Sequence, residues 1–472
     1  MNKFISFLNI SNHPASARKE FLFNLLLGVA TLIIFIAVKD TTIMQAAING
    51  WFDYYIMFRM DAETDTQTAA KNISFLDFDN KSFQALNKPD LTPRDKIAEL
   101  LSVAHRGNAR IVILDFDFAE PDYSPARKLF DGEIAKSGSE RDRELFDAIE
   151  RVKNDSASQT KILLPLTNYA DKTIKRNVFS SLIDNEKIFG VTPTLTTNRI
   201  GDNYARFWLP YIEVKDAETD ERKILWSIPL LTAVLYDGNF AGLEKLQDDI
   251  LHSDKNFFVT SLHRETTEQF KFYRERTADG GLLRDTSALQ YNRIQYAAVP
   301  PDVLTQFPFG TIEPANIAHW RKDGLDNKRI DCNDKIVIIG RADDDSADFF
   351  LTPCGDLTGM YVHGNSIASI LGETRPHLAP LYKYVLIELL LILIAAYSFL
   401  GLSEFKAKVV IFVLTPLCWI LNYVYFCFTN EFVYLSFAFT VVGIYNFVNN
   451  VQAFILRLRG ISSINFLRRN RL

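Results

Sequence analysis

Acidic side chains follow three short apolar segments of this 472-residue chain, each at the point where the segment ends. Asp77 and Asp79 follow the first segment, Asp115 and Asp117 follow the second, and a later acidic run ends at Asp348. Ligands of parallel α/β sheets bind outside the carboxyl ends of the strands, so these carboxylates could converge on one crevice. The pattern predicts a site for a cation, a basic ligand or a polyhydroxyl ligand.

Two further residues belong to this hypothesis. Arg94 lies in the first turn of a predicted helix and could face the same rim, and His363 begins a helix just beyond the last acidic run. The alternative is structural: Asp77 and Asp115 would cap helix N-termini or pair with Arg94, and His363 would be a satisfied core histidine. The sequence leaves both interpretations open and does not say whether a metal ion binds.

A catalytic alternative starts from the same residues. A strand followed by Asp115 and Asp117, with a later acidic cluster, is similar to the arrangement in haloacid-dehalogenase-type phosphatases. Phe118 and Ala119 stand where a hydroxyl-bearing residue would normally follow, which argues against phosphoryl transfer. The chain also has no GxSxG, Walker, HExxH or CxxC motif. We therefore expect no catalysis and no cofactor.

The apolar segments predict the elements that position these residues. Segments 72–78 and 110–116 are typical of strands buried on both faces of a parallel sheet. Between them, Thr92 and Pro93 predict the start of a helix and Gly107 its end. The other predicted elements are helices at 140–152, 230–236 and 363–371, strands at 161–166 and 335–340, and a hairpin of 207–214 with 223–227. The fold class is α/β, with a mainly parallel sheet flanked by helices.

Four apolar segments are long enough to cross a bilayer as helices. One is N-terminal and three are C-terminal: 21–38, 384–402, 409–428 and 432–448. The first is followed directly by Lys39 and Asp40 rather than by a small-residue cleavage site, so we predict an uncleaved anchor.

The charge distribution predicts the orientation in the membrane. Residues 39–383 carry a net charge of −11, whereas the flanking segments carry +6. The positive-inside rule then places the 1–20 and 453–472 tails in the cytoplasm and 39–383 outside it, as one domain of a multi-pass inner (plasma) membrane protein. The acidic domain is a poor partner for nucleic acid. The arginine-rich 453–472 segment is expected to contact anionic lipid or a protein partner, or to be a plain stop-transfer tail.

Two cysteines, Cys332 and Cys354, fall in the predicted external domain. They would form a disulfide if their Cα atoms approach within bridging distance, and otherwise they are two thiols. The sequence does not decide between these alternatives.

The order of several short motifs resembles the second class of CHASE domains, the extracellular sensory modules associated with cyclases and histidine kinases. The motifs are Phe75–Asp79, Thr92–Arg94, Gly107–Phe118 with Glu120 and Pro121, Arg206–Pro210, Ser227–Leu230, Lys335–Gly340, Asp348, Thr352–Pro353, Gly359 and His363–Asn365. The resemblance implies a sensory role and adds Asn365 to the candidate ligand-binding residues. Family members commonly carry an output module after the last span, and we expect none in 453–472.

Together these features predict a membrane-anchored sensory or recognition protein. It would bind an unknown ligand or protein outside the cytoplasm and pass the signal through its spans to a cytoplasmic or membrane partner. A homo-oligomer is compatible with this layout. The alternative from another class is a structural subunit of a cell-envelope complex.

Overall fold

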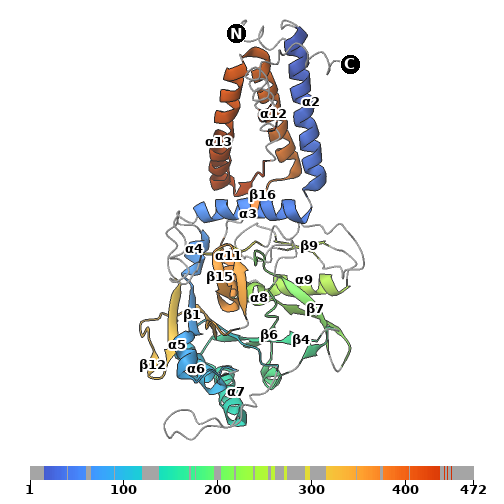
Figure 1. The fold of residues 1–472 in the computed structure, drawn as a ribbon. Coiled ribbons are helices and arrows are strands. Elements are labelled where there is room, and N and C mark those ends of the chain that lie inside the picture. Colours follow the sequence, from blue (N-terminus) through green and yellow to red (C-terminus); the bar gives the residue numbers. More distant parts are fainter. Residues whose placement is uncertain are drawn as a thin grey trace. The chain divides into compact units, whose positions relative to one another are not determined.

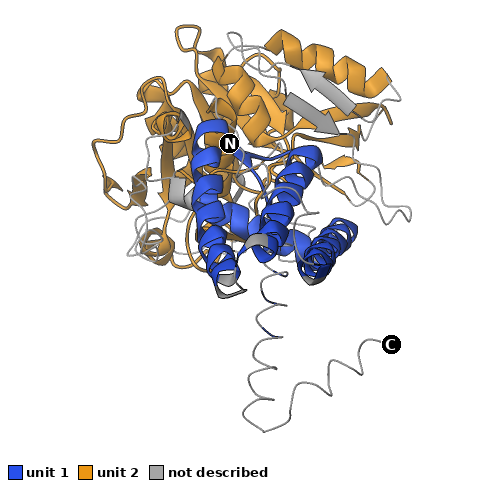
Figure 2. Ribbon diagram, turned by 90° about the horizontal axis from the view of Figure 1, so that it is seen from above, with its two compact units in different colours: residues 1–55, 376–472 blue, residues 56–375 orange. Residues whose placement is uncertain are grey.

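A computed structural model describes residues 15–435 apart from several gaps, together with residues 441, 444 and 448. The gaps are residues 40, 60–64, 90, 120–137, 170–171, 176, 196–203, 217–218, 238–239, 253–256, 261–269, 274–292, 298–314, 347, 373–375 and 403. The chain forms two compact units (Figure 2). Unit 1 contains residues 1–55 and 376–472, and unit 2 contains residues 56–375.

Unit 2 is built around a seven-stranded sheet in the order β12–β11–β1–β13–β2–β3–β6. All neighbouring strands are parallel except β12, which runs antiparallel to β11. The strands are β1 (Ile73–Phe78), β2 (Ile111–Asp115), β3 (Lys161–Pro165), β6 (Ile188–Val191), β11 (Asn316–Arg321), β12 (Gly324–Leu325) and β13 (Ile336–Arg341). The mixed α/β class and the mainly parallel sheet are confirmed.

Strand β13 lies between β1 and β2, although it follows them by more than 200 residues. The first crossover, through helix α6 (Arg94–Arg106), therefore passes over a strand position that β13 later fills. As a result the carboxyl ends of β1, β13 and β2 lie next to one another. These are the three strand ends that carry the acidic residues.

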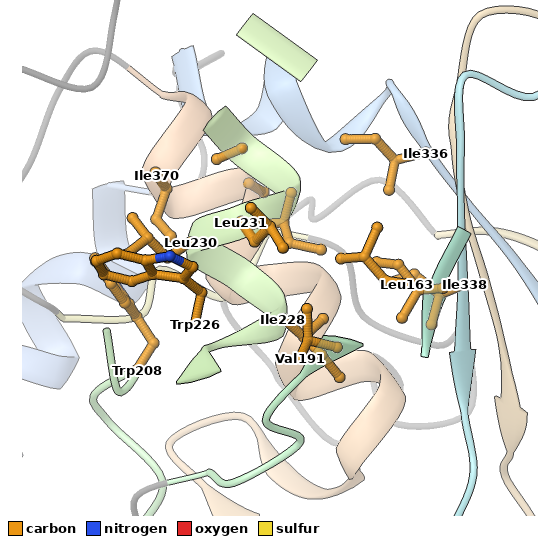
Figure 3. Packing of buried hydrophobic residues seen from close by; sticks show 14 of the residues in the cluster. Leu163, Val191, Trp208, Trp226, Ile228, Leu230, Leu231, Ile336, Ile338 and Ile370 are labelled. Carbon is orange, nitrogen blue, oxygen red and sulfur yellow. The ribbon is translucent and has the colours of Figure 1, made fainter. Parts of the chain in front are cut away.

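Helices cover both faces of this sheet, which explains why its strands are almost continuously apolar. One face packs against α6 and α7 (Gly138–Asn154), and the other packs against α8 (Ile228–Asp237), α9 (Phe240–His252) and α11 (Gly359–Leu371) (Figure 1). Figure 3 shows the second layer, where Ile336 and Ile338 of the sheet face Ile228 and Leu231 of α8. Both layers exclude water from the sheet.

Helix α6 begins one residue later than the sequence suggested. Its N-cap is Pro93, without a side-chain hydrogen bond, rather than Thr92, and the predicted C-cap at Gly107 is confirmed. Thr92 is itself buried.

The remaining elements of unit 2 are α4 (Asp65–Ala70), α5 (Asn80–Ala85), β4 (Thr167–Asn168), β5 (Ile174–Lys175), the 3₁₀ turn Ser180–Leu182, β7 (Tyr211–Lys215), β8 (Arg222–Trp226), β9 (Phe257–Thr260), β10 (Phe270–Tyr273), β14 (Phe349–Thr352) and β15 (Gly355–Thr358).

Within the described residues, unit 1 contains three helices that are long and apolar enough to cross a membrane. They are α2 (Ala15–Val38), α12 (Leu381–Gly401) and α13 (Glu404–Thr429). Helices α2 and α12 pack together, with Gly28 placed directly against Ile392. The fourth predicted span, 432–448, lies mostly outside the described residues, so a count of four spans stays a prediction.

Sequence analysis missed a helix that follows the first span. Helix α3 (Thr42–Arg59) begins within four residues of the end of α2. Unit 1 also contains the short pair β16 (His377–Leu378) and β17 (Glu431–Phe432), which joins the segment before α12 to the segment after α13.

Cys332 and Cys354 are not joined by a disulfide. Cys332 belongs to the core on the α6 and α7 face of the sheet, whereas Cys354 belongs to the core on the α11 face. The sheet separates the two sulfur atoms, and both cysteines are buried. Of the two alternatives open at the level of sequence, the structure shows the one without a bridge.

The close contact between α11 and β1 predicts a specific sensitivity to added volume. A Cβ at Gly364 would lie 2.5 Å from Cζ of Phe75. We expect Gly364→Ala to destabilise the protein by about 1–3 kcal/mol, because the Phe75 ring is held in a packed core. Gly50→Ala is the control, since no atom lies within 4 Å of its added Cβ. Thermal unfolding of the full chain checks this, and equal melting temperatures for the two variants would contradict it.

Candidate functional site

The centre of the candidate site is a row of three residues across adjacent strands. Asp77 of β1 is paired in register with Gly340 of β13, and Gly340 is paired with Asp115 of β2. The two aspartates therefore lie about 10 Å apart, two strand spacings, with a glycine between them. Side chains alternate along a strand, so both carboxylates share the face that α11 covers. Met360 of α11 occupies the space above Gly340.

Asp115 forms an acid pair with Asp348, as the sequence suggested. Its side chain is only 9% exposed, and within the described residues it receives no hydrogen bond. Burial and the nearby charge of Asp348 raise the pKa of Asp115 well above its usual range. Asp348 is exposed as a residue, but its carboxylate lies against Gly359, and burial on that side raises its pKa to about 6.

His363 lies in the second turn of α11 and faces the acid pair. Its Nε2 atom is 3.9 Å from Oδ1 of Asp115, and its side chain is 2% exposed. Burial lowers the pKa of His363 to about 3, so the ring is neutral at physiological pH. Within the part of the chain that the structure describes, its Nδ1 atom has no hydrogen-bond partner. Asp115, Asp348 and His363 together form the acid cluster.

Asp77 is satisfied by its own neighbours rather than by a helix N-terminus. Its two carboxylate oxygens contact Nδ1 of His319 and the hydroxyl of Tyr361, which donates a hydrogen bond of 2.7 Å. Burial raises the pKa of Asp77, and the hydrogen bond to Asp77 raises the pKa of His319. Sequence analysis missed both partners, because strand β11 and the start of α11 were not predicted.

Two other acids at this edge, Asp79 and Asp343, are neutralised by arginine. Arg321 makes two hydrogen bonds to Asp79, of 2.7 and 2.8 Å, and Asp79 caps helix α5 by accepting from the backbone NH of Ser82. Burial acts to raise the pKa of Asp79, but the bonds from Arg321 and Ser82 prevail and lower it to about 2. Arg341 likewise makes two hydrogen bonds to Asp343. These pairs are structural.

Three predicted site residues lie elsewhere. Arg94 is buried on the α6 and α7 side, where it pairs with Asp142 and lies over the rings of Phe118 and Phe179. The structural alternative in which Asp77 or Asp115 pairs with Arg94 is therefore wrong, because the sheet lies between them. Asp117 is exposed and closes a turn by accepting from the NH of Ala119. Asn365 donates to the carbonyl of Tyr361 within α11.

The acid cluster can take part in ligand recognition. Two carboxylates and one neutral imidazole offer acceptors to a ligand that donates hydrogen bonds or carries positive charge. Within the described residues, no group of three or more His, Cys, Asp or Glu side chains is arranged to hold a metal ion.

Comparison with protein families matches residues 29–403 to the CHASE2 domain. The match covers more than half of the chain, so the protein belongs to the CHASE2 domain family, a family of extracellular sensory domains and not of enzymes. The resemblance in the short motifs is thereby confirmed. Comparisons with curated proteins and with solved structures give no match.

The acid pair predicts a pH-dependent cost to stability. The pKa of Asp348 is about 6 in the folded protein, above its unfolded value, so the folded protein binds more protons between about pH 4 and 6 and loses stability as pH rises through that window. His363 acts in the opposite sense, because its lowered pKa costs stability as pH falls below about 6.5.

Comparison with a variant isolates the effect of Asp348. We expect Asp348→Asn to stabilise the protein at pH 7 by about 1 kcal/mol, allowing for solvent screening, and by much less at pH 4. Asp345→Asn, at an exposed position in the same acidic run, should change little at either pH. Melting temperatures of the full chain across this range check the prediction, which fails if the two variants follow the same curve.

Proposed function

We propose that this protein is a membrane-anchored sensor that binds a small ammonium-class cation at the acid cluster outside the cytoplasm. The observation that carries the proposal is the buried carboxylate of Asp115, which has no hydrogen bond within the described residues. Its neighbours at the same edge show the contrast: Asp79 has Arg321, Asp343 has Arg341, and Asp77 has His319 and Tyr361. A buried carboxylate is costly unless a proton or a cation compensates it.

The donor set favours an ammonium group over other cations. An ammonium group has several N–H donors, and the two carboxylates and the neutral His363 ring are acceptors. The side-chain grouping that a metal ion would need is absent from the described residues. A polyhydroxyl ligand would leave both carboxylate charges uncompensated.

The signal would reach the membrane through the chain itself. Helix α11 covers the strand ends that carry the acid cluster. Fewer than ten residues separate the end of α11 from the start of the candidate span α12. A ligand that binds one packing of α11 better than another would shift the population of the two states. A separate cytoplasmic or membrane protein would then read the state of the spans. This relay and the inner-membrane location belong to the proposal.

The first test measures ligand binding to the full chain in detergent. Rising concentrations of methylammonium chloride should raise the melting temperature in a saturable way, because a ligand of the folded state stabilises it. Sodium chloride controls for ionic strength, and tetramethylammonium controls for positive charge without N–H donors. Asp115→Asn should abolish the gain, whereas Asp345→Asn should keep it.

The outcome also separates the classes of function. Equal responses to methylammonium and tetramethylammonium would contradict recognition through N–H donors. Stabilisation by calcium or magnesium chloride, lost in Asp115→Asn, would replace the ammonium ligand by a metal ion. A flat response to every cation would contradict the sensor and favour a structural subunit that uses this fold for protein contact alone.

The second test measures sidedness in intact cells. Asp323→Cys, at an exposed turn of unit 2, should react with a membrane-impermeant maleimide, because residues 39–383 are proposed to lie outside the cytoplasm. Lys406→Cys, at an exposed position near the start of α13, should react only after permeabilisation. The reverse pattern of labelling would overturn the proposed orientation.

A further inference from the structure

Helix α3 carries an apolar stripe along its exposed side. Ile43, Ala47, Trp51 and Tyr54 recur at intervals of four, four and three residues, which places them on one face of the helix. All four are exposed, and Ile43 reaches 81%. All the remaining positions between residues 43 and 55 are buried or partly buried. This exposed face therefore has no charged side chain.

The adjoining side of α3 is fixed to the end of span α13. Phe52 stacks on Phe432 at a ring separation of 5.0 Å, and its edge meets Phe426 at 5.9 Å. The hydroxyl of Tyr55 donates to the carbonyl of Trp419. Figure 1 shows α3 lying across the ends of the spans instead of running alongside them.

A cluster of charged residues marks this end of the spans as the boundary with water. Glu431, directly before Phe432, binds Lys383 and the hydroxyl of Tyr425 and lies 3.6 Å from His377. Charged groups of this kind are stable in the polar boundary zone and costly in hydrocarbon. Because Phe52 stacks on the residue next to Glu431, α3 lies at the level of this boundary.

We propose that α3 is an interfacial helix whose stripe inserts into the lipid of the leaflet that faces the proposed extracytoplasmic side. This inference rests on the proposed insertion of the spans. Trp and Tyr side chains favour the membrane interface. The stripe meets span α13 at Trp51, whose ring lies 4.2 Å from that of Trp419, and α13 itself exposes Phe412 (80%) and Phe428 (84%). Lipid therefore covers the stripe.

The composition of the helix also predicts the kind of lipid contact. No Lys or Arg occurs between residues 42 and 55, so anionic headgroups are not needed for binding. Zwitterionic phosphatidylcholine should suffice. The helix would then fix the level at which unit 1 sits in the bilayer.

The test uses the full chain in phosphatidylcholine nanodiscs with a photoreactive benzoylphenylalanine placed at one position at a time. Ile43, Ala47 and Tyr54 probe the stripe, Phe412 is the control within a span, and Tyr169, which is 52% exposed in unit 2, is the control in water. After irradiation, mass spectrometry should find lipid adducts at the stripe positions and at Phe412, and none at Tyr169.

The pattern of lipid adducts distinguishes a failure of the interfacial helix from a failure of the proposed membrane insertion of the spans. Lipid adducts at Phe412 without adducts on the stripe would overturn the interfacial helix and leave the spans in place. An absence of adducts at Phe412 as well would overturn the membrane insertion on which the inference rests. Cross-links between two copies of the chain at the stripe would also overturn it, because a second protomer would then be the occupant.

Discussion

The site depends on how closely helix α11 approaches the sheet. Three glycines permit this approach: Gly340 lies under Met360, Gly359 lies against the carboxylate of Asp348, and Gly364 lies against the ring of Phe75. A side chain at any of these positions would push the helix away or displace a neighbour. The close approach brings His363 to the face that carries Asp115, and it takes both residues out of water. Burial then sets their pKa values.

Charge compensation divides the acidic edge into two parts. Asp79 and Asp343 are held by arginines, so they contribute to the fold and are not available to a ligand. Asp115 and Asp348 instead face one another and a neutral histidine, an arrangement that is most stable with a bound proton or cation. Within the described residues, Asp115 thus lacks the arginine or hydrogen-bond partner that Asp79, Asp343 and Asp77 each have, and this contrast underlies the proposed ligand site.

Local patterns in the sequence predicted much of this arrangement. The buried strands β1, β2 and β13, helix α6 and the convergence of Asp77, Asp115, Asp348 and His363 all follow from apolar runs and from the rule for strand ends. The partners of Asp77 and Asp79 did not, because His319 and Arg321 lie on strand β11, whose place in the sheet is set by contacts distant in sequence. The position of Arg94 was also missed, because neither its ring contacts nor its partner Asp142 is local.

The central claim is that the charge on the acid cluster is coupled to the packing of α11. Hydrogen exchange of the α11 backbone amides in the full chain, compared at pH 5 and pH 7.5 after correction for intrinsic rates, tests this coupling most directly. The account predicts weaker protection at pH 7.5, where Asp348 has lost its proton beside the buried carboxyl group of Asp115, and no such change in the Asp115→Asn, Asp348→Asn double variant. Equal protection at the two pH values in the unmodified protein would contradict it.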